Sequence, residues 1–380
     1  MKIQRFQIDS GNQKCYSFIF PPNLLRSKTL QRQPIEYYCY KVMKMNILTQ
    51  TDETQKVKAV TPKSRGRGCL TRLAWLAVLP IGLILAGWIY ESLAEAADMK
   101  AYPPPGQMVD VGGYRLHINC TGSGIPTVVI ESGWGDMSAS WGWVQPEVAK
   151  TTRICSYDRA GMGWSEASPQ PRTAGVYVKE LRTLLTKANE PGPYVLVGHS
   201  MGGFTVILYA HDYPAEVSGL VLIDSQDLPN SNGATPPPTP KPGGISLPAL
   251  LARIGLVRLL ANPLGSVENL PEGEKQAYTA FSVAPRGVRA VTDEFIGMSE
   301  GGARARAVTS LGALPLIVLS RGKDLDAKHT AAQTGLLQLS TNSQQLIAEQ
   351  SGHPIMIEQP EAAIAAIGNM VEMVRQAAQK

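Results

Sequence analysis

Short apolar runs alternate with longer helical patterns through most of the chain, and this alternation is the feature that most limits its possible folds. Strands that are apolar on both faces and separated by helices are typical of a mostly parallel sheet covered on both sides. The sequence therefore predicts an α/β protein. The expected strands are 126–131, 153–157, 194–197, 219–223, 314–319 and 345–348, and the expected helices include 174–188, 201–213 and 360–378.

Two features interrupt this regular alternation. At its start, two short runs flank Gly112-Gly113, which predicts a two-residue hairpin and one antiparallel strand. Between residues 225 and 312, a proline-rich loop precedes helical stretches with a broad apolar stripe. We interpret 225–312 as a helical cap, and 102–224 together with 313–380 as the core that carries it.

The run from Leu73 to Tyr90 contains 18 consecutive uncharged, mostly apolar residues. As a helix it measures roughly 27 Å at 1.5 Å per residue, close to the hydrocarbon thickness of a bilayer. We interpret 70–91 as a transmembrane anchor or an uncleaved signal. The pattern Ala94-Glu95-Ala96 also leaves open a cleaved signal peptide, and a buried helix of the globular domain is a third alternative.

Charge is distributed unevenly about this segment. Residues 1–72 hold 14 Lys and Arg against four Asp and Glu, whereas the rest of the chain holds 22 against 27. Basic residues before a membrane segment stay in the cytoplasm, so we expect the carboxyl-terminal domain to lie on the extracytoplasmic side, or to be secreted if the segment is cleaved. The acidic folded part excludes nucleic-acid binding, which needs a basic face. We expect residues 1–68 to be a disordered basic extension.

Gly198-His199-Ser200-Met201-Gly202 lies between an apolar run and a helical stretch. A serine between glycines in a sharp strand-to-helix turn projects its hydroxyl above the sheet, as a nucleophile requires. The pattern therefore predicts Ser200 as a nucleophile.

A serine nucleophile needs a base, and our candidate is His353, because it follows the last expected strand at the carboxyl edge of the sheet. The acid that orients this histidine should also follow a strand. Our first choice is Asp324, which comes after the run 314–319. Asp224, directly after an earlier run, and Asp326 remain alternatives.

The negative oxygen formed when a serine attacks a carbonyl needs two backbone N–H donors. Met201, the residue after the nucleophile, should supply one of them. The other should come from Trp134 in the loop Ser132-Gly133-Trp134-Gly135, with its indole lining the acyl pocket. We expect the apolar stripe of the cap to cover this pocket and to favour apolar acyl groups. The stripe contains Leu250, Leu251, Ile254 and Val257.

These motifs resemble the α/β-hydrolase superfamily, over residues 102–378. The resemblance rests first on Gly198–Gly202 and on Ser351-Gly352-His353. It rests also on the loop 157–165, which is similar to the superfamily's D-x-x-G-x-G-x-S stretch.

The resemblance implies an α/β-hydrolase fold, with an eight-stranded, mostly parallel sheet, helices on both faces and a helical cap inserted after strand six. It agrees with the triad of Ser200, His353 and Asp324. We interpret Asp158, in the loop 157–165, and its neighbour Arg159 as structural. The oxyanion loop departs from the pattern, since it begins with serine and glycine where these enzymes commonly have His-Gly.

The strand order that the resemblance implies also makes the second and fourth strands neighbours. Cys120 ends the second strand and Cys155 lies in the fourth, so a disulfide between them is within reach. Outside the cytoplasm such a bond would persist. The alternative is a pair of small buried thiols that never bond.

We therefore expect a serine hydrolase that cleaves a carboxylic ester, thioester or amide through an acyl-enzyme on Ser200. An acyltransferase with the same acyl-enzyme and an inactive ligand-binding homologue are the alternatives. The expected partners are a small, apolar acyl substrate and a membrane, contacted through residues 73–90. No cofactor or metal site is expected, because the histidines lack the spacing of H-E-x-x-H or similar motifs.

Overall fold

The computed structural model describes residues 8–10, 13–15, 66–225, 244–260 and 266–379. The chain divides into two compact units, Met1–Gly66 and Arg67–Lys380. In the first unit, strands β1 (Ile8–Ser10) and β2 (Gln13–Cys15) pair antiparallel. These two strands fall within the extension that we expect to be disordered, and the other residues up to 65 lie outside the described part of the chain.

The second unit contains one sheet of eight strands in the order β10-β9-β8-β7-β5-β6-β4-β3. The strands from β5 to β10 are parallel to one another, whereas β4 is antiparallel to both β6 and β3. The order implied by the resemblance is confirmed. The strands are β3 (Gln107–Asp110), β4 (Arg115–Thr121), β5 (Thr127–Glu131), β6 (Ile154–Tyr157), β7 (Tyr194–His199), β8 (Val217–Ile223), β9 (Leu316–Arg321) and β10 (Ser343–Ala348).

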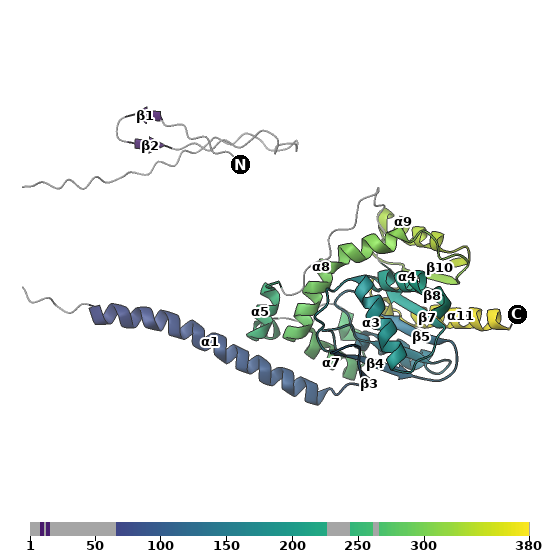
Figure 1. Cartoon of the computed structure of the whole chain (residues 1–380), viewed down its shortest axis with the longest axis horizontal. Coiled ribbons are helices and arrows are strands. Elements are labelled where there is room, and N and C mark those ends of the chain that lie inside the picture. The colour runs from purple at the N-terminus through teal and green to yellow at the C-terminus, as the bar shows by residue number, and fades with distance from the viewer. Residues whose placement is uncertain (1–7, 11–12, 16–65, 226–243, 261–265, 380) are drawn as a thin grey trace, which may run out of the picture. The chain divides into compact units, whose positions relative to one another are not determined.

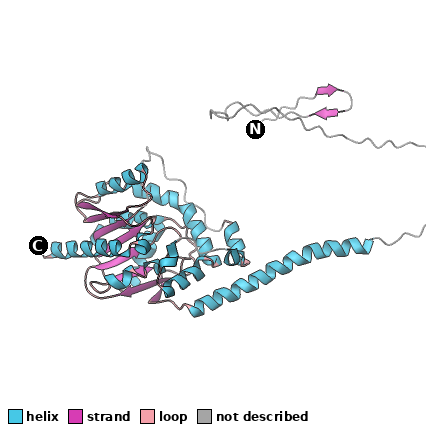
Figure 2. Ribbon diagram, turned by 180° about the vertical axis from the view of Figure 1, so that it is seen from behind, coloured by secondary structure: helices cyan, strands magenta, loops and turns pink. Residues whose placement is uncertain are grey.

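Helices cover both faces of this sheet (Figures 1 and 2). Val129 of β5 packs in a cluster with α3 and α4, while its neighbours Val128 and Ile130 pack with α2 and α11. Successive strand side chains point to opposite faces, so both faces of these strands must be apolar. The helices of the core are α2 (Val144–Val148), α3 (Ala174–Lys187), α4 (Gly202–Asp212), α9 (Ala327–Leu336), α10 (Ile355–Glu358) and α11 (Pro360–Ala378).

The insertion between β8 and β9 is helical, as expected. It contains α5 (Leu247–Arg253), α6 (Leu256–Leu260), α7 (Glu272–Ser282) and α8 (Pro285–Ala307). The expected proline-rich loop at 236–240 lies outside the described residues. Short 3-10 helices occur at η2 (Ser138–Trp141), η3 (Pro214–Glu216), η4 (Ser266–Asn269) and η5 (Leu337–Leu339).

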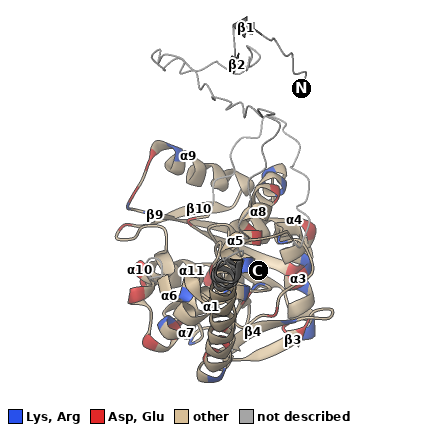
Figure 3. Ribbon diagram, turned by 90° about the vertical axis from the view of Figure 1, so that its left-hand side faces the viewer, with Lys and Arg blue, Asp and Glu red and all other residues tan. Residues whose placement is uncertain are grey.

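Helix α1 (Gly66–Ala101) contains the predicted membrane segment and is longer than the expected 70–91. Its part from Val78 to Ala101 is long and apolar enough to cross a membrane, and little of it is buried. Figure 3 shows α1 nearly end-on, with α5 and α6 beside it. The helix ends close to β3, which begins the sheet.

The chain forms the disulfide rather than two free thiols. Cys120 of β4 and Cys155 of β6 are directly opposite each other in the antiparallel register and are bonded. The bond joins two strands that are neighbours in space although 35 residues apart in sequence.

Candidate active site

Ser200 lies in the sharp turn between β7 and α4, and its backbone has a φ of 51°. This left-handed conformation is rare for a residue with a side chain and stores strain. The flanking glycines allow the turn. A Cβ on Gly198 would lie 2.5 Å from Val206 Cγ2, and one on Gly202 would lie 2.5 Å from the carbonyl oxygen of Glu131.

Three side chains from separate strand ends form a continuous hydrogen-bonded chain. His353 Nδ1 donates to Asp224 Oδ2 at 2.5 Å, and His353 Nε2 lies 2.9 Å from Ser200 Oγ. Because the carboxylate accepts a hydrogen bond from Nδ1–H, the proton of the neutral imidazole stays on Nδ1, and Nε2 is left as the acceptor for the serine hydroxyl. The arrangement therefore leaves Ser200 beside a base that can remove its proton.

The carboxylate beside His353 belongs to Asp224, so our first choice of Asp324 is corrected. Both ring nitrogens of His353 are already used, one by Asp224 and one by Ser200. Asp324 is exposed in the turn after β9. Asp326 is the N-cap residue of α9, where its Oδ1 accepts a hydrogen bond from the backbone N–H of His329.

Asp224 is 2% exposed and its carboxylate has several donors. Besides His353, it accepts from His329 Nε2 at 2.7 Å and from Arg321, through both the backbone N–H and the guanidinium, at 3.3 Å. Burial acts to raise the pKa of Asp224, but the hydrogen bond and charge of His353 and those of Arg321 lower it overall. Asp224 therefore carries a negative charge near neutral pH.

His199 is buried under the site and remains neutral. Burial, together with the nearby His353, lowers its pKa to about 3. Its Nε2 donates to the backbone carbonyl of His353 at 3.1 Å, and the two rings lie 4.7 Å apart. His199 thus supports the loop that carries the base.

The loop after β5 lies against the nucleophile. A Cβ on Gly133 would lie 3.2 Å from the Cβ of Ser200. Within the described part of the chain, neither the N–H of Trp134 nor that of Met201 has an acceptor. The Trp134 indole donates to the carbonyl of Val291 at 2.9 Å and lies 5.5 Å from the ring of Phe295, so it contacts cap helix α8.

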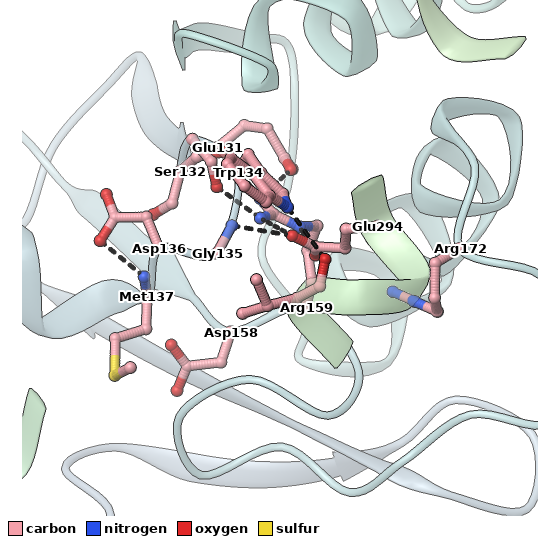
Figure 4. A network of polar contacts seen from close by, with 12 residues as sticks. Glu131, Ser132, Trp134, Gly135, Asp136, Met137, Asp158, Arg159, Arg172 and Glu294 are labelled. Atoms are coloured by element: carbon pink, nitrogen blue, oxygen red, sulfur yellow. Dashed lines mark hydrogen bonds and ion pairs between the residues drawn. The ribbon is translucent and has the colours of Figure 1, made fainter. Parts of the chain in front are cut away.

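The side chain of Arg159 forms hydrogen bonds with the backbone of this loop, in the network of polar contacts drawn in Figure 4. Its guanidinium donates to the carbonyls of Ser132 and Gly133 at 2.6 and 2.5 Å. It also pairs with Glu131 at 2.9 Å and with Glu294 of α8 at 2.6 Å. Burial acts to lower the pKa of Arg159, but Glu294 and Glu131 raise it well above its usual value, so it remains charged.

Asp158, the neighbour of Arg159 in the loop 157–165, also has structural contacts. It is fully buried and accepts from His117 Nδ1 at 2.9 Å and from the backbone N–H of Ser138 at 2.7 Å. Burial acts to raise the pKa of Asp158, but His117 lowers it overall. Neither Asp158 nor Arg159 contacts the Ser200 hydroxyl or His353 in the described structure.

A cavity of about 280 Å³ opens beside Ser200, His353 and Asp224, and the residues that line its described part are mostly polar. Two larger cavities, of about 380 and 550 Å³, are lined by no triad residue, so chemistry and not size identifies the site. The apolar stripe of the cap does not line the 280 Å³ cavity. Ile254 of that stripe lies instead against Gly87 of α1. The lining residues are Ser200, Asp224, Ser225, Arg321, Asp326, Lys328, His329, Ala332, Gln333 and His353.

Sequence patterns did not single out the residues that support Asp224 and the oxyanion loop. His329 and Arg321 reach Asp224 from α9 and β9, and Glu294 reaches Arg159 from the cap. None of them belongs to a short motif. The sequence offered only the negative charge of Glu294 on an amphipathic helix as a signal. Such charges are common on the exposed faces of helices, so this one did not indicate a buried contact.

A model described as the alpha/beta hydrolase family matches residues 128–367 of this chain. Among curated proteins, the uncharacterized YbdG of Bacillus subtilis is 28% identical over 151 residues, which are 39% of this chain and 46% of that protein. The uncharacterized YqjL of the same organism is 39% identical over 103 residues, which are 27% and 41%. The chain spans less than half the length of these two relatives.

Solved structures have the same fold. An esterase from Thermogutta terrifontis matches with a TM-score of 0.53 and 23% identity, over 70% of this chain and 98% of the esterase. The enol-lactonase from Burkholderia xenovorans LB400 matches with a TM-score of 0.54 and 20% identity, over 70% of this chain and all of the lactonase. At these identities the likeness shows the fold alone.

Proposed function

Since this chain belongs to the alpha/beta hydrolase family, we propose that it is a serine hydrolase that cleaves a carboxylic ester, thioester or amide. The observation that carries the proposal is the hydrogen-bonded chain from Ser200 through His353 to Asp224. The nucleophile lies within hydrogen-bonding distance of the base, and the base within hydrogen-bonding distance of the orienting acid, as an acyl-enzyme mechanism requires. The same intact chain argues against an inactive binding protein.

In the proposed reaction, Ser200 Oγ attacks the substrate carbonyl while His353 Nε2 takes the hydroxyl proton. The imidazolium then gives this proton to the leaving group, and an ester of Ser200 remains. Water attacks that ester with His353 again acting as base, which releases the acid and restores the serine. Asp224 keeps the Nδ1–H tautomer of His353 and stabilises its positive charge during both steps.

The backbone N–H groups of Trp134 and Met201 are proposed to bind the negative oxygen of the tetrahedral intermediate. Support comes from the close approach of Gly133 to Ser200 and from the lack of another acceptor for either N–H in the described structure. The hydrogen bonds would then form only when charge develops, which is when they accelerate the reaction.

The substrate is proposed to be a small molecule with an apolar group near its carbonyl. The rings of Trp134 and Phe295 lie 5.5 Å apart at a tilt of 43°, beside the loop that contacts Ser200, and the two residues are 46% and 62% exposed. An apolar acyl or alcohol group that covers these rings would remove apolar surface from water.

The catalytic domain is proposed to be anchored through α1 on the extracytoplasmic side of a membrane. The length and composition of α1 and the basic residues before it support this arrangement. The Cys120–Cys155 disulfide supports it independently, because such bonds persist outside the cytoplasm.

A fluorophosphonate probe tests the proposed chemistry on the full chain, because it reacts only with an activated serine. We expect labelling of the native protein and none of Ser200→Ala. Ser218→Ala, which removes a half-buried hydroxyl from β8, is the matched control and should label normally. A folded native protein that does not label would contradict the proposal. Product analysis with an added alcohol then separates hydrolysis from acyl transfer.

A further inference from the structure

The last turns of α1 are fastened to cap helices α5 and α6 by ion pairs. Glu91 is fully buried and accepts two hydrogen bonds from Arg258, at 2.9 and 3.0 Å. Arg258 also pairs with Asp98 at 2.8 Å. Arg253 of α5 pairs with Glu95 at 3.6 Å. The cap helices α5 and α6 therefore contact α1 directly through their side chains.

The backbones of α1 and the cap also meet closely. A Cβ on Gly87 would lie 2.3 Å from the carbonyl oxygen of Ile254, and one on Gly255 would lie 2.8 Å from the ring of Tyr90. The turn between α5 and α6 therefore touches α1 at the last turn of the apolar run 73–90. If α1 spans a bilayer, this is the level at which it leaves the hydrocarbon region.

Large apolar side chains are exposed on both sides of this turn. Leu259 and Leu260 of α6 are 68% and 75% exposed. We call the exposed residues the cap patch; they are Ile245, Leu247, Leu250, Leu259 and Leu260.

We propose that the cap patch lies in the membrane interface and that its partner is the acyl-chain region of the bilayer that α1 spans. The proposal rests on the membrane anchor and the serine hydrolase proposed above. Continuity carries it, because the patch borders the contact between the cap and the chain's own membrane helix. A water-exposed position would leave the five side chains hydrated at a free-energy cost.

Further contacts link the segment that carries the cap patch to the residues beside the nucleophile. The start of α5 is bonded to α8, where Arg289 donates to the carbonyl of Gly244 at 2.7 Å. Phe295, less than two turns further along α8, contacts the ring of Trp134 in the loop beside Ser200. The substrate class that fits this arrangement is an acyl ester of a membrane lipid, which would reach the aromatic pair without crossing bulk water.

Fluorescence from a label at position 259 tests the membrane contact without relying on activity. The full chain, with Cys15, Cys39 and Cys69 replaced by Ser, receives Leu259→Cys and an environment-sensitive nitrobenzoxadiazole label in phosphatidylcholine vesicles. We expect its emission to shift to shorter wavelength and to be quenched by nitroxide lipids rather than by aqueous iodide. Ile347→Cys, exposed on edge strand β10, is the control and should remain iodide-sensitive. Iodide quenching at 259 equal to that at 347 would overturn the proposal.

Hydrolysis tests the consequence for substrate. We expect the ratio of rates on a vesicle-embedded ester and a soluble ester to fall in the variant Leu259→Ser/Leu260→Ser and to stay constant in Ile347→Ser. An unchanged ratio in the leucine variant contradicts delivery from the bilayer. A native chain that cleaves neither ester and does not react with a fluorophosphonate overturns the proposed hydrolase function, while the fluorescence result still decides the membrane contact.

A second inference comes from the contacts of Arg159 with the oxyanion loop. Arg159 Nη2 holds the carbonyl oxygen of Gly133 at 2.5 Å. That carbonyl and the N–H of Trp134 belong to one peptide group, which is planar, and in a trans peptide the two point in opposite directions. Arg159 therefore orients the N–H of Trp134 away from itself.

The cap holds Arg159 in turn. Glu294 Oε1 accepts from Arg159 Nε at 2.6 Å, and Glu294 Oε2 accepts from the backbone N–H of Gly135 at 3.0 Å. Glu294 is fully buried, so these bonds are protected from water. We infer that Glu294 is a positioning residue for the oxyanion donor, since it holds both Arg159 and the backbone of Gly135. The position of α8 thereby affects the rate of the chemical step.

A graded series of variants tests this role. We expect Glu294→Ala to lower kcat about 10- to 100-fold, with KM nearly unchanged, because loss of an entire oxyanion donor costs about 10²–10³. Glu294→Gln, which keeps one acceptor oxygen, should fall between this variant and the native protein. The reaction with a fluorophosphonate should slow in the same order.

The control is Glu300→Ala, which removes another buried carboxylate from α8. Glu300 pairs with Arg304 at 3.8 Å and does not contact the oxyanion loop. It should lower thermal stability without the loss of kcat. Equal losses of kcat and stability in the Glu294 and Glu300 variants would overturn the inference.

Discussion

The carboxylate that orients His353 shows how much one residue's position depends on neighbouring strands. Asp224 follows Ile223 directly, with a φ of 39°, and its backbone N–H donates to the carbonyl of Leu319 at 2.7 Å. The backbone at the end of β8 is thus bonded to β9, while the carboxylate of Asp224 points toward His353. Asp324 comes three residues after the end of β9 and is exposed.

We predict that Asp224→Asn lowers kcat about 10²- to 10⁴-fold, because an amide can stabilise the wrong tautomer of His353 and cannot neutralise its positive charge. Asp324→Asn should change kcat less than about threefold, as expected for an exposed group without a triad contact. Steady-state hydrolysis of a soluble ester measures both. The reverse result would reassign the acid to Asp324.

His199 predicts a specific dependence of stability on pH. Its pKa in the folded chain is about 3, below the roughly 6.5 of an unfolded histidine. Between these values only the unfolded chain binds the proton, so the contribution is complete above about pH 6.5 and is lost as pH falls. From pH 7 to pH 5, His199 should cost the native protein about 2 kcal/mol of unfolding free energy.

Denaturant unfolding of the full chain in detergent, followed by tryptophan fluorescence, measures this loss. His199→Gln keeps a donor for the His353 carbonyl but has no group that takes up a proton. Between pH 7 and pH 5, the unfolding free energy of this variant should therefore fall by about 2 kcal/mol less than that of the native protein. Other groups titrate in both proteins and cancel in the comparison. Parallel pH profiles for the two proteins would show that His199 is not the group responsible.

At the scale of elements, the disulfide joins β4 to β6 where the sheet changes from parallel to antiparallel pairing. It closes a chain segment with a sequence separation of 35 residues. In the chain-entropy description, a loop of that length stabilises the folded state by about 3–4 kcal/mol. The pair Cys120→Ala/Cys155→Ala should therefore lower the unfolding free energy by up to that amount.

Reduction provides the matched control for this prediction. Dithiothreitol should lower the denaturation midpoint of the native chain and leave that of the double variant unchanged. If dithiothreitol leaves the native midpoint unchanged as well, the bond contributes no stability. Thiol counting by mass spectrometry, before and after reduction, confirms that the cysteines were bonded in the sample.

At the scale of the whole molecule, the proposed anchoring of α1 in a membrane predicts on which side the hydrolase core lies. We predict that alkaline phosphatase, which needs export to become active, is active when fused after Lys380. A fluorescent protein that matures only in the cytoplasm should be dark at the same place. The basic residues before α1 are the physical reason, because they are retained in the cytoplasm.

Fusions after residue 65, in front of α1, should give the opposite pattern and serve as the control. Fluorescence of the fusion after Lys380 would place the core in the cytoplasm. It would also remove the reason for the Cys120–Cys155 bond to persist, so the topology and disulfide experiments check each other.

Local patterns predicted most of the fold because they depend on short-range geometry. Two-faced apolar runs such as Thr127–Glu131 became central strands, and Gly112-Gly113 became the turn between β3 and β4. The glycines about Ser200 predicted the sharp turn for the same reason, since the crowding there arises between atoms close in sequence. The pairing of Cys120 with Cys155 needed the strand order as well, which the family resemblance implied.

By itself, then, the sequence determined the element order, the nucleophile turn, the candidate base and the membrane-length helix, all of which follow from the neighbours of each residue along the chain. Only the tertiary structure decided that Asp224, not Asp324, lies beside His353 and that Glu294 of the cap reaches Arg159. The first contact joins residues that are 129 positions apart in the sequence, and the second joins residues that are 135 positions apart. The physical reason is that a carboxylate at a strand end or on a helix looks the same in sequence whether water or a buried cation is its partner.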